Sequence, residues 1–133
     1  MVQHVMIRLD DETNLAVIAP GDANIWTDDQ EIMWSIIDDR LEWDNANFPN
    51  RAVIFGPEWK GSTPEPVGPP VIPDRRPYVA TGPGPASQLP WGSGMAKFTY
   101  EAHVTASGTG LSFKALTRDD MIDPDISNQP HPP

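Results

Sequence analysis

Residues 97–105 read Lys-Phe-Thr-Tyr-Glu-Ala-His-Val-Thr, a stretch in which apolar and polar side chains alternate without a break. Phe98, Tyr100, Ala102 and Val104 share one parity, and polar residues occupy the other. Successive side chains of a β-strand point to opposite faces, so a period of two indicates a strand with one face toward a core. This stretch therefore predicts a long, half-buried β-strand.

Further strands are predicted where short apolar or alternating runs lie between turn residues. The run after the turn at Ser107–Gly110 is expected to form a hairpin with residues 97–105, because a Gly-containing turn separates the two. In the first run, Val5, Ile7 and Leu9 are expected to face the core. The predicted strands cover residues 2–9, 15–18, 30–37, 51–55, 111–116 and 121–127.

Residues 30–37 allow two interpretations. Ile32, Trp34 and Ile36 alternate as in a strand, but Ile32, Ile36 and Asp39 also lie at helical spacing. We favour a strand because the run is short and rich in β-branched and aromatic residues. Apolar residues at both parities indicate a central strand covered on both faces.

Short strands separated by turns, without a convincing amphipathic helix, predict an all-β fold. We expect an antiparallel Greek-key β-sandwich, of cupredoxin-like or immunoglobulin-like type, with a long proline-rich loop. A chain of 133 residues fits one domain. The domain is expected over residues 1–128, followed by a polar tail at 129–133.

The expected loop spans residues 56–94 and holds ten of the 16 prolines and seven of the ten glycines. Proline lacks a backbone donor, so we expect neither a helix nor a strand ladder here. A disordered linker is one interpretation. We favour an ordered loop, partly polyproline II, because its apolar side chains could hold it against the sandwich.

The chain carries 9 basic and 19 acidic residues, for a net charge of −10. Such a charge repels phosphate backbones and anionic lipid surfaces, so nucleic acid and membranes are not expected partners. Cations, basic protein surfaces and neutral sugars remain possible partners. The chain has no cysteine, no recognisable signal peptide and no apolar run of membrane-spanning length. A cytoplasmic location is expected, with a secreted or periplasmic one open if the chain is a processed form.

The order of features carries a resemblance. A Trp-bearing stretch at Ile32–Ile36 is followed by the aromatic stretch at Phe98–Ala102, and the Asp123-Pro124-Asp125-Ile126 step comes close to the end. This order resembles the cupredoxin-like sandwiches, including metal-free bacterial members. It is also similar to bacterial inclusion-body proteins of the PixA and AidA type. The resemblance implies a Greek-key sandwich but carries over no copper site, because that site needs a cysteine ligand.

Histidine and acidic residues are the candidate metal ligands. His4 and His103 are expected on one outer face, where they could hold copper with Met6, although solvated surface histidines are the simpler interpretation. Calcium could bind loop carboxylates, but no cluster has the EF-hand pattern, and solvated turn residues explain most of them. No metal or cofactor is therefore expected. The acidic clusters lie at residues 10–12, 28–31, 38–39 and 119–125.

No set of catalytic residues is recognisable, and we expect a protein that is not an enzyme. A hydrolase would need two carboxylates, or a Ser–His pair, meeting in one cleft. The expected function is a non-catalytic interaction or structural protein that self-associates or belongs to a larger assembly. The alternative is a carbohydrate-binding module that uses loop tryptophans. The candidate partner-binding residues are Trp43, Trp59, Tyr78 and Trp91.

Overall fold

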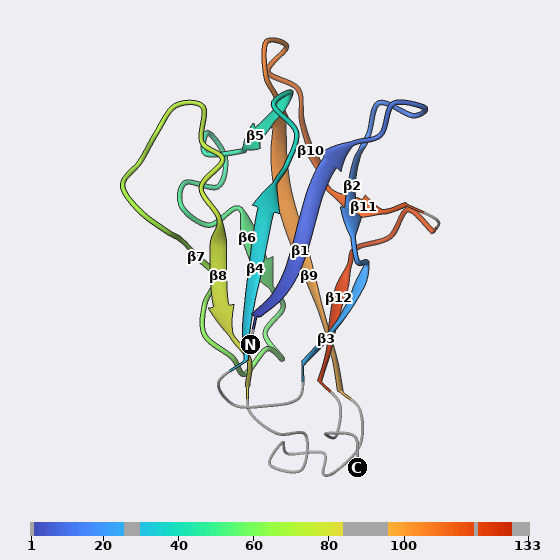
Figure 1. Ribbon diagram of the computed structural model, residues 1–133, viewed down its shortest axis with the longest axis vertical. Helices are drawn as coiled ribbons and strands as arrows, with labels where there is room; N and C mark the ends of the chain where they lie inside the picture. Colours follow the sequence, from blue (N-terminus) through green and yellow to red (C-terminus); the bar gives the residue numbers. More distant parts are fainter. Residues whose placement is uncertain (1, 26–29, 84–95, 119, 129–133) are drawn as a thin grey trace.

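A computed structural model describes residues 2–25, 30–83, 96–118 and 120–128. These residues form two six-stranded mixed sheets that pack face to face as a sandwich (Figure 1). The all-β class and the sandwich predicted from the sequence are confirmed. Within these residues, no helix has the length and apolarity required to cross a membrane.

The first sheet has the strand order β11-β2-β1-β4-β8-β7. β1 pairs antiparallel with β2 and parallel with β4, and β4 pairs antiparallel with β8. β7 is a two-residue edge strand beside β8. The bounds are β1 Val2–Leu9, β2 Ala16–Ala19, β4 Glu31–Ile36, β7 Glu65–Pro66, β8 Tyr78–Thr81 and β11 Leu116–Thr117.

The second sheet is built around β9 (Ala96–Ala106), the longest strand. β10 and β12 pair antiparallel with one edge of β9, and β5 and β6 with the other. β3 extends the sheet by pairing parallel with β12. The remaining bounds are β3 Asp22–Ile25, β5 Leu41–Trp43, β6 Val53–Phe55, β10 Ser112–Lys114 and β12 Asp125–Asn128.

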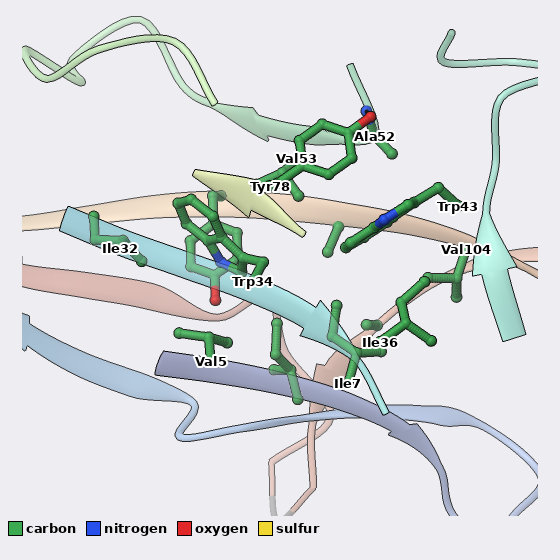
Figure 2. Packing of buried hydrophobic residues seen from close by; sticks show 14 of the residues in the cluster. Val5, Ile7, Ile32, Trp34, Ile36, Trp43, Ala52, Val53, Tyr78 and Val104 are labelled. Atoms are coloured by element: carbon green, nitrogen blue, oxygen red, sulfur yellow. Dashed lines mark hydrogen bonds between the residues drawn. The ribbon is translucent and has the colours of Figure 1, made fainter. Parts of the chain in front are cut away.

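The core lies between the two sheets, and the strands that contribute its buried side chains are β1–β6, β8, β9 and β12 (Figure 2). Trp34 of β4 is fully buried and meets Tyr100 of β9 edge to face, with ring centroids 5.4 Å apart. Val5 and Ile7 of β1 are also fully buried. Each buried aliphatic side chain of this size contributes about 1.5–3 kcal/mol relative to an exposed one.

Several predictions about strands are confirmed. β9 covers the whole of residues 97–105, and the four apolar residues of that stretch are buried. Residues 30–37 contain a strand, so the helical interpretation is wrong. The expectation that both faces of this strand are covered is also wrong, because Ile37 is exposed and Met33 only half-buried.

The antiparallel prediction needs correction, because both sheets are mixed. β1 and β4 are parallel neighbours, and β12 pairs parallel with β3 at the other end of the sequence. Alternation along a strand specifies its buried face but not the direction of its neighbours. A chain that passes between two sheets can return to the first sheet in either direction.

The prediction that residues 56–94 form no strand ladder is wrong, because β7 and β8 lie within them. Pro66 is tolerated in β7 because an edge strand has backbone groups that need no ladder partner. β8 itself contains no proline. Residues 84–94 and the expected tail at 129–133 lie outside the described residues.

Candidate functional site

Two of the predicted partner-binding residues lie in the core (Figure 2). Trp43 belongs to β5, not to a loop, and is 2% exposed, and Tyr78 of β8 is fully buried. Their rings meet edge to face with centroids 4.7 Å apart. The Trp43 indole N–H donates to the carbonyl of Arg76 (2.7 Å), and the Tyr78 hydroxyl accepts from the Ala52 N–H (3.1 Å). Neither ring is presented to a partner.

The other two are Trp59 and Trp91, of which Trp91 lies outside the described residues. Trp59 is half-buried and stacks on Phe55, with ring centroids 3.9 Å apart. Its indole N–H donates to the carbonyl of Ser62 (2.9 Å), and its ring meets Phe98 edge to face. Trp59 thus holds the segment after β6 against the second sheet.

A groove lies beside Trp59, with a volume of about 350 Å³. We call it the Trp59 groove. Arg51 is the one charged residue among those that line it. Its lining residues are Arg51, Val53, Ile54, Phe55, Gly56, Pro57, Trp59, Gly61, Thr63 and Pro64.

The chain between β7 and β8, residues 67–77, forms a second candidate binding element, which we call the β7–β8 loop. Figure 1 shows it as a wide yellow-green arc beside β7 and β8. Its base contains a buried ion pair between Asp74 and Arg76, whose side chains are 5% and 8% exposed. Arg76 donates from Nε to Asp74 Oδ1 (2.9 Å) and from Nη2 to Oδ2 (2.7 Å). This two-bond geometry is the strongest form of a guanidinium–carboxylate pair.

Three further hydrogen bonds connect the ion pair to its surroundings. Arg76 Nη1 donates to the carbonyl of Gly68 (2.9 Å), and Nη2 donates to Asn50 Oδ1 (2.9 Å). Asn45 Nδ2 donates to Asp74 Oδ2 (2.6 Å). Because Gly68 lies near the start of the loop and Asp74 near its end, the pair joins the two sides of the loop.

The electrostatics follow from this geometry. Burial alone would raise the pKa of Asp74, but the hydrogen bonds from Arg76 and Asn45 outweigh burial and lower the pKa. The hydrogen bond to Asp74 raises the pKa of Arg76. Both groups are therefore ionised at neutral pH.

The tip of the β7–β8 loop is apolar and exposed. Ile72 is 99% exposed, Val67 51% and Val71 48%. Residues 66–73 contain no charged side chain, although the whole chain is strongly acidic. The expectation that the apolar side chains of the proline-rich segment hold it against the sandwich is therefore wrong for Val71 and Ile72. In the sequence, the signal for an exposed apolar tip is the uncharged run at residues 66–73, which ends before Asp74.

The two described histidines do not share a face, which corrects the expected arrangement. His4 lies on β1 of the first sheet and His103 on β9 of the second. His103 is also not a solvated surface residue. Its ring stacks on Phe48 with centroids 3.7 Å apart, and its Nε2 lies 3.1 Å from Glu101 Oε1. His131 lies outside the described residues.

The acidic clusters form ion pairs and turns in the described part of the chain. Asp38 and Asp11 both accept hydrogen bonds from Arg40, and Asp10 accepts one from Thr13. Among the residues that the structure describes, no three His, Asp or Glu side chains are placed to hold a metal ion.

Asp22 and Asp125 lie opposite each other on the parallel strands β3 and β12. They line a cavity of about 480 Å³ together with Lys97 and Arg118. Burial, and then the hydrogen bond to Asp22, raises the pKa of Asp125 to about 6. Asp125 Oδ1 is buried without a donor among the described groups, and a buried oxygen without a donor disfavours the ionised form of the carboxyl.

Lys97 Nζ lies 3.7 Å from Asp22 Oδ2, and Ser127 donates a hydrogen bond to Asp22 Oδ1. The pair is thus held by cross-strand contacts between neighbouring strands.

In comparisons with known proteins, no family model matches this chain and no curated protein sequence matches it.

Proposed function

We propose that this protein is a non-catalytic interaction or structural protein that self-associates or serves as an accessory subunit of a larger assembly. Its contact element is the β7–β8 loop. The observation that carries this proposal is the 99% exposure of Ile72 at the tip of a loop whose base is held by a buried ion pair.

A loop of this kind is suited to binding for a thermodynamic reason. Association costs free energy when flexible segments must be ordered, and an element that is already ordered avoids much of this cost. The Asp74–Arg76 pair and the bond to Gly68 order the loop in the free protein. Ile72 and Val71 then offer apolar area whose removal from water favours association.

A photo-crosslinking experiment tests the proposal. A photoreactive phenylalanine analogue replaces Ile72, and in a matched control it replaces Leu111, which is 65% exposed just before β10. Both proteins are irradiated in the cells that produce them, and adducts are identified by mass spectrometry. Discrete adducts from position 72 but not from position 111 are expected. Absence of adducts at position 72, or the same adducts at both positions, would overturn the proposal.

Carbohydrate binding is the second candidate function, and the Trp59 groove favours it. The groove combines an aromatic pair, Phe55 and Trp59, with the polar side chains of Arg51 and Thr63. Aromatic rings beside polar groups suit the alternating apolar and hydroxyl surfaces of sugars. A glycan array followed by fluorescence titration of the wild type and Trp59→Ala decides this candidate. If no sugar binds the wild type more tightly than it binds Trp59→Ala, this candidate is eliminated.

The finer description of the fold is likewise a proposal. We propose a cupredoxin-like Greek-key connection of the strands, supported by the two-sheet architecture. An experimental structure whose connections superpose on no Greek-key sandwich would contradict it. We also propose a cytoplasmic location, which cell fractionation tests.

A further inference from the structure

We infer that His4, Met6 and Met33 form a binding site for Cu(I) on the outer face of the first sheet, with one imidazole nitrogen and two thioether sulfurs as ligands. The inference goes beyond the proposed function, because these residues lie on β1 and β4 and not in the β7–β8 loop. It adds a metal ion bound at the surface of the protein and assigns no reaction to that ion.

The register of the first sheet brings the three residues together. β1 and β4 are parallel neighbours (Figure 1), and His4 and Met33 are partners across the two strands. Neighbouring strands lie about 4.8 Å apart, and residues two apart on one strand are separated by about 6.6 Å. Met6 follows His4 by two residues, so its side chain leaves the sheet on the same side. The three positions therefore form a small triangle on one face.

Burial shows that this face is the outer one. Val5 and Ile7, which alternate with His4 and Met6 on β1, are fully buried. His4 is exposed, and Met6 is 43% exposed. Met33 is half-buried, and its two neighbours in the sequence are both buried on the opposite face. An ion can therefore reach the three side chains from the solvent.

The chemistry of the three side chains favours Cu(I). Thioether sulfur is a soft ligand that suits Cu(I), and imidazole also binds copper. Protein sites for Zn²⁺ use Cys, His, Asp and Glu, and sites for Mg²⁺ and Ca²⁺ use oxygen ligands. Cu(II) prefers nitrogen and oxygen ligands. The methionine side chain is unbranched and has three rotatable bonds, so each sulfur can move to the distance that the ion requires.

The imidazole of His4 is available to a metal ion. Within the described residues, the His4 side chain has no hydrogen bond, ion pair or ring contact. His103, the other histidine considered as a copper ligand, stacks on Phe48 and belongs to the second sheet. The structure thus removes His103 from that ligand set and brings Met33 in its place. The net charge of −10 also draws cations toward the protein.

Competition for Cu(I) tests the site. The protein is titrated under nitrogen, with ascorbate as reductant, against a chromophoric chelator of Cu(I), and we expect one ion per chain. Met6→Leu and Met33→Leu retain an apolar side chain of similar size without sulfur, and His4→Gln removes the imidazole. Each variant should weaken binding at least about tenfold, the loss that even an outer partner of a metal ligand causes.

Met121→Leu is the matched control, because Met121 is 36% exposed and lies between β11 and β12. It should bind Cu(I) as the wild type does. The three altered side chains lie outside the core, so each variant should fold, which circular dichroism verifies. A wild type that does not bind Cu(I), or an equal affinity in the control and the three variants, would overturn the inference.

Methionine labelled with ¹³C at its methyl group gives a second test that reports on each residue separately. The leucine variants identify the signals of Met6, Met33 and Met121 in the spectrum of the labelled protein. One equivalent of Cu(I) should shift the signals of Met6 and Met33 and leave that of Met121 in place. A shift of only one of the first two, or an equal shift of the third, would overturn the inference.

Discussion

The guanidinium of Arg76 and the carboxylate of Asp74 form the same hydrogen-bond pattern as Arg40 and Asp38. In each pair Nε lies 2.9 Å from Oδ1, and Nη2 lies 2.7 or 2.8 Å from Oδ2. The arginine follows the aspartate by two residues in both. The pairs differ in burial, because the Arg76 side chain is 8% exposed and that of Arg40 is 51% exposed.

This duplication provides a matched experiment on the base of the β7–β8 loop. Arg76→Met leaves the Asp74 carboxylate buried without its cation, which should lower the free energy of unfolding by about 3–5 kcal/mol. Arg40→Met should cost less, because water screens the Arg40 side chain and the Asp38 carboxylate, itself 9% exposed, keeps the backbone N–H donors of Leu9 and residue 40. Urea denaturation at neutral pH measures both. Equal losses in the two variants would show that Arg76 contributes no more than a surface residue.

The double variant Asp74→Asn/Arg76→Met serves as the control for the buried charge. It removes the charge that Arg76→Met leaves behind, so it should recover part of the lost stability. If the double variant is as unstable as Arg76→Met, the loss of stability comes from lost packing and not from the uncompensated carboxylate.

Loss of the hydroxyl should change the stability of the protein in opposite directions at two buried tyrosines. Tyr78→Phe removes the acceptor of the Ala52 N–H and leaves that donor buried, at a cost of about 1–3 kcal/mol. The Tyr100 hydroxyl is buried without a well-formed hydrogen bond in the described part of the chain, and burial raises its pKa. Tyr100→Phe should therefore leave stability unchanged or raise it. Thermal denaturation compares the variants. A larger loss of stability for Tyr100→Phe than for Tyr78→Phe would contradict this prediction.

The Asp22–Asp125 pair predicts a specific dependence of stability on pH. The pKa of Asp125 is raised to about 6 from its ordinary 3.8, so the folded protein binds this proton more tightly than the unfolded chain. The contribution of Asp125 to stability is fully present below its ordinary pKa and is lost as pH rises toward about 6. The pKa of Asp22 is lowered by its hydrogen bonds against the effect of burial, and its contribution is lost below its ordinary 3.8.

Asp125→Asn isolates this effect, because an amide can donate to Asp22 as the protonated carboxyl does. The variant should exceed the wild type by less near pH 4.5 than at pH 8, where the gain is at most about 1 kcal/mol once solvent screening is included. Melting temperatures at the two pH values measure the difference. Glu12→Gln, at an exposed position, controls for the change in net charge. The same gain at both pH values would contradict the raised pKa of Asp125.

Gly61 lies so close to Trp59 and to β8 that no side chain fits at this position. A Cβ at position 61 would lie 2.3 Å from the Trp59 ring and 2.4 Å from the backbone carbonyl of Thr81. Gly61→Ala should lower stability by about 1–3 kcal/mol, because the carbonyl belongs to a strand and cannot move freely. At Gly56 the nearest atom is the flexible Glu58 carboxylate, 3.2 Å away, so Gly56→Ala is the control. Chemical denaturation that shows equal effects would argue against a close approach at Gly61.

The candidate site was only partly predictable. The proline-rich segment was identified as a binding element because its apolar side chains do not suit a solvated linker. Prolines and polar residues surround Trp43 and Tyr78 in the sequence, which predicts loops at both positions. Their burial depends on β5 pairing with β9 and β8 with β4, contacts that join residues far apart in the chain. Pairing across such distances leaves no trace in a local pattern.

By itself, the sequence determined that the chain forms strands and which side of β1 and β9 is buried. Alternation at period two is a local property, and in residues 97–105 it leaves only one arrangement that removes Phe98, Tyr100, Ala102 and Val104 from water together. Tertiary structure alone decided the parallel pairing of β1 with β4, the separation of His4 from His103, and the ion pair beneath the β7–β8 loop. These features depend on which segments meet in space, and that is set by the packing of the whole core.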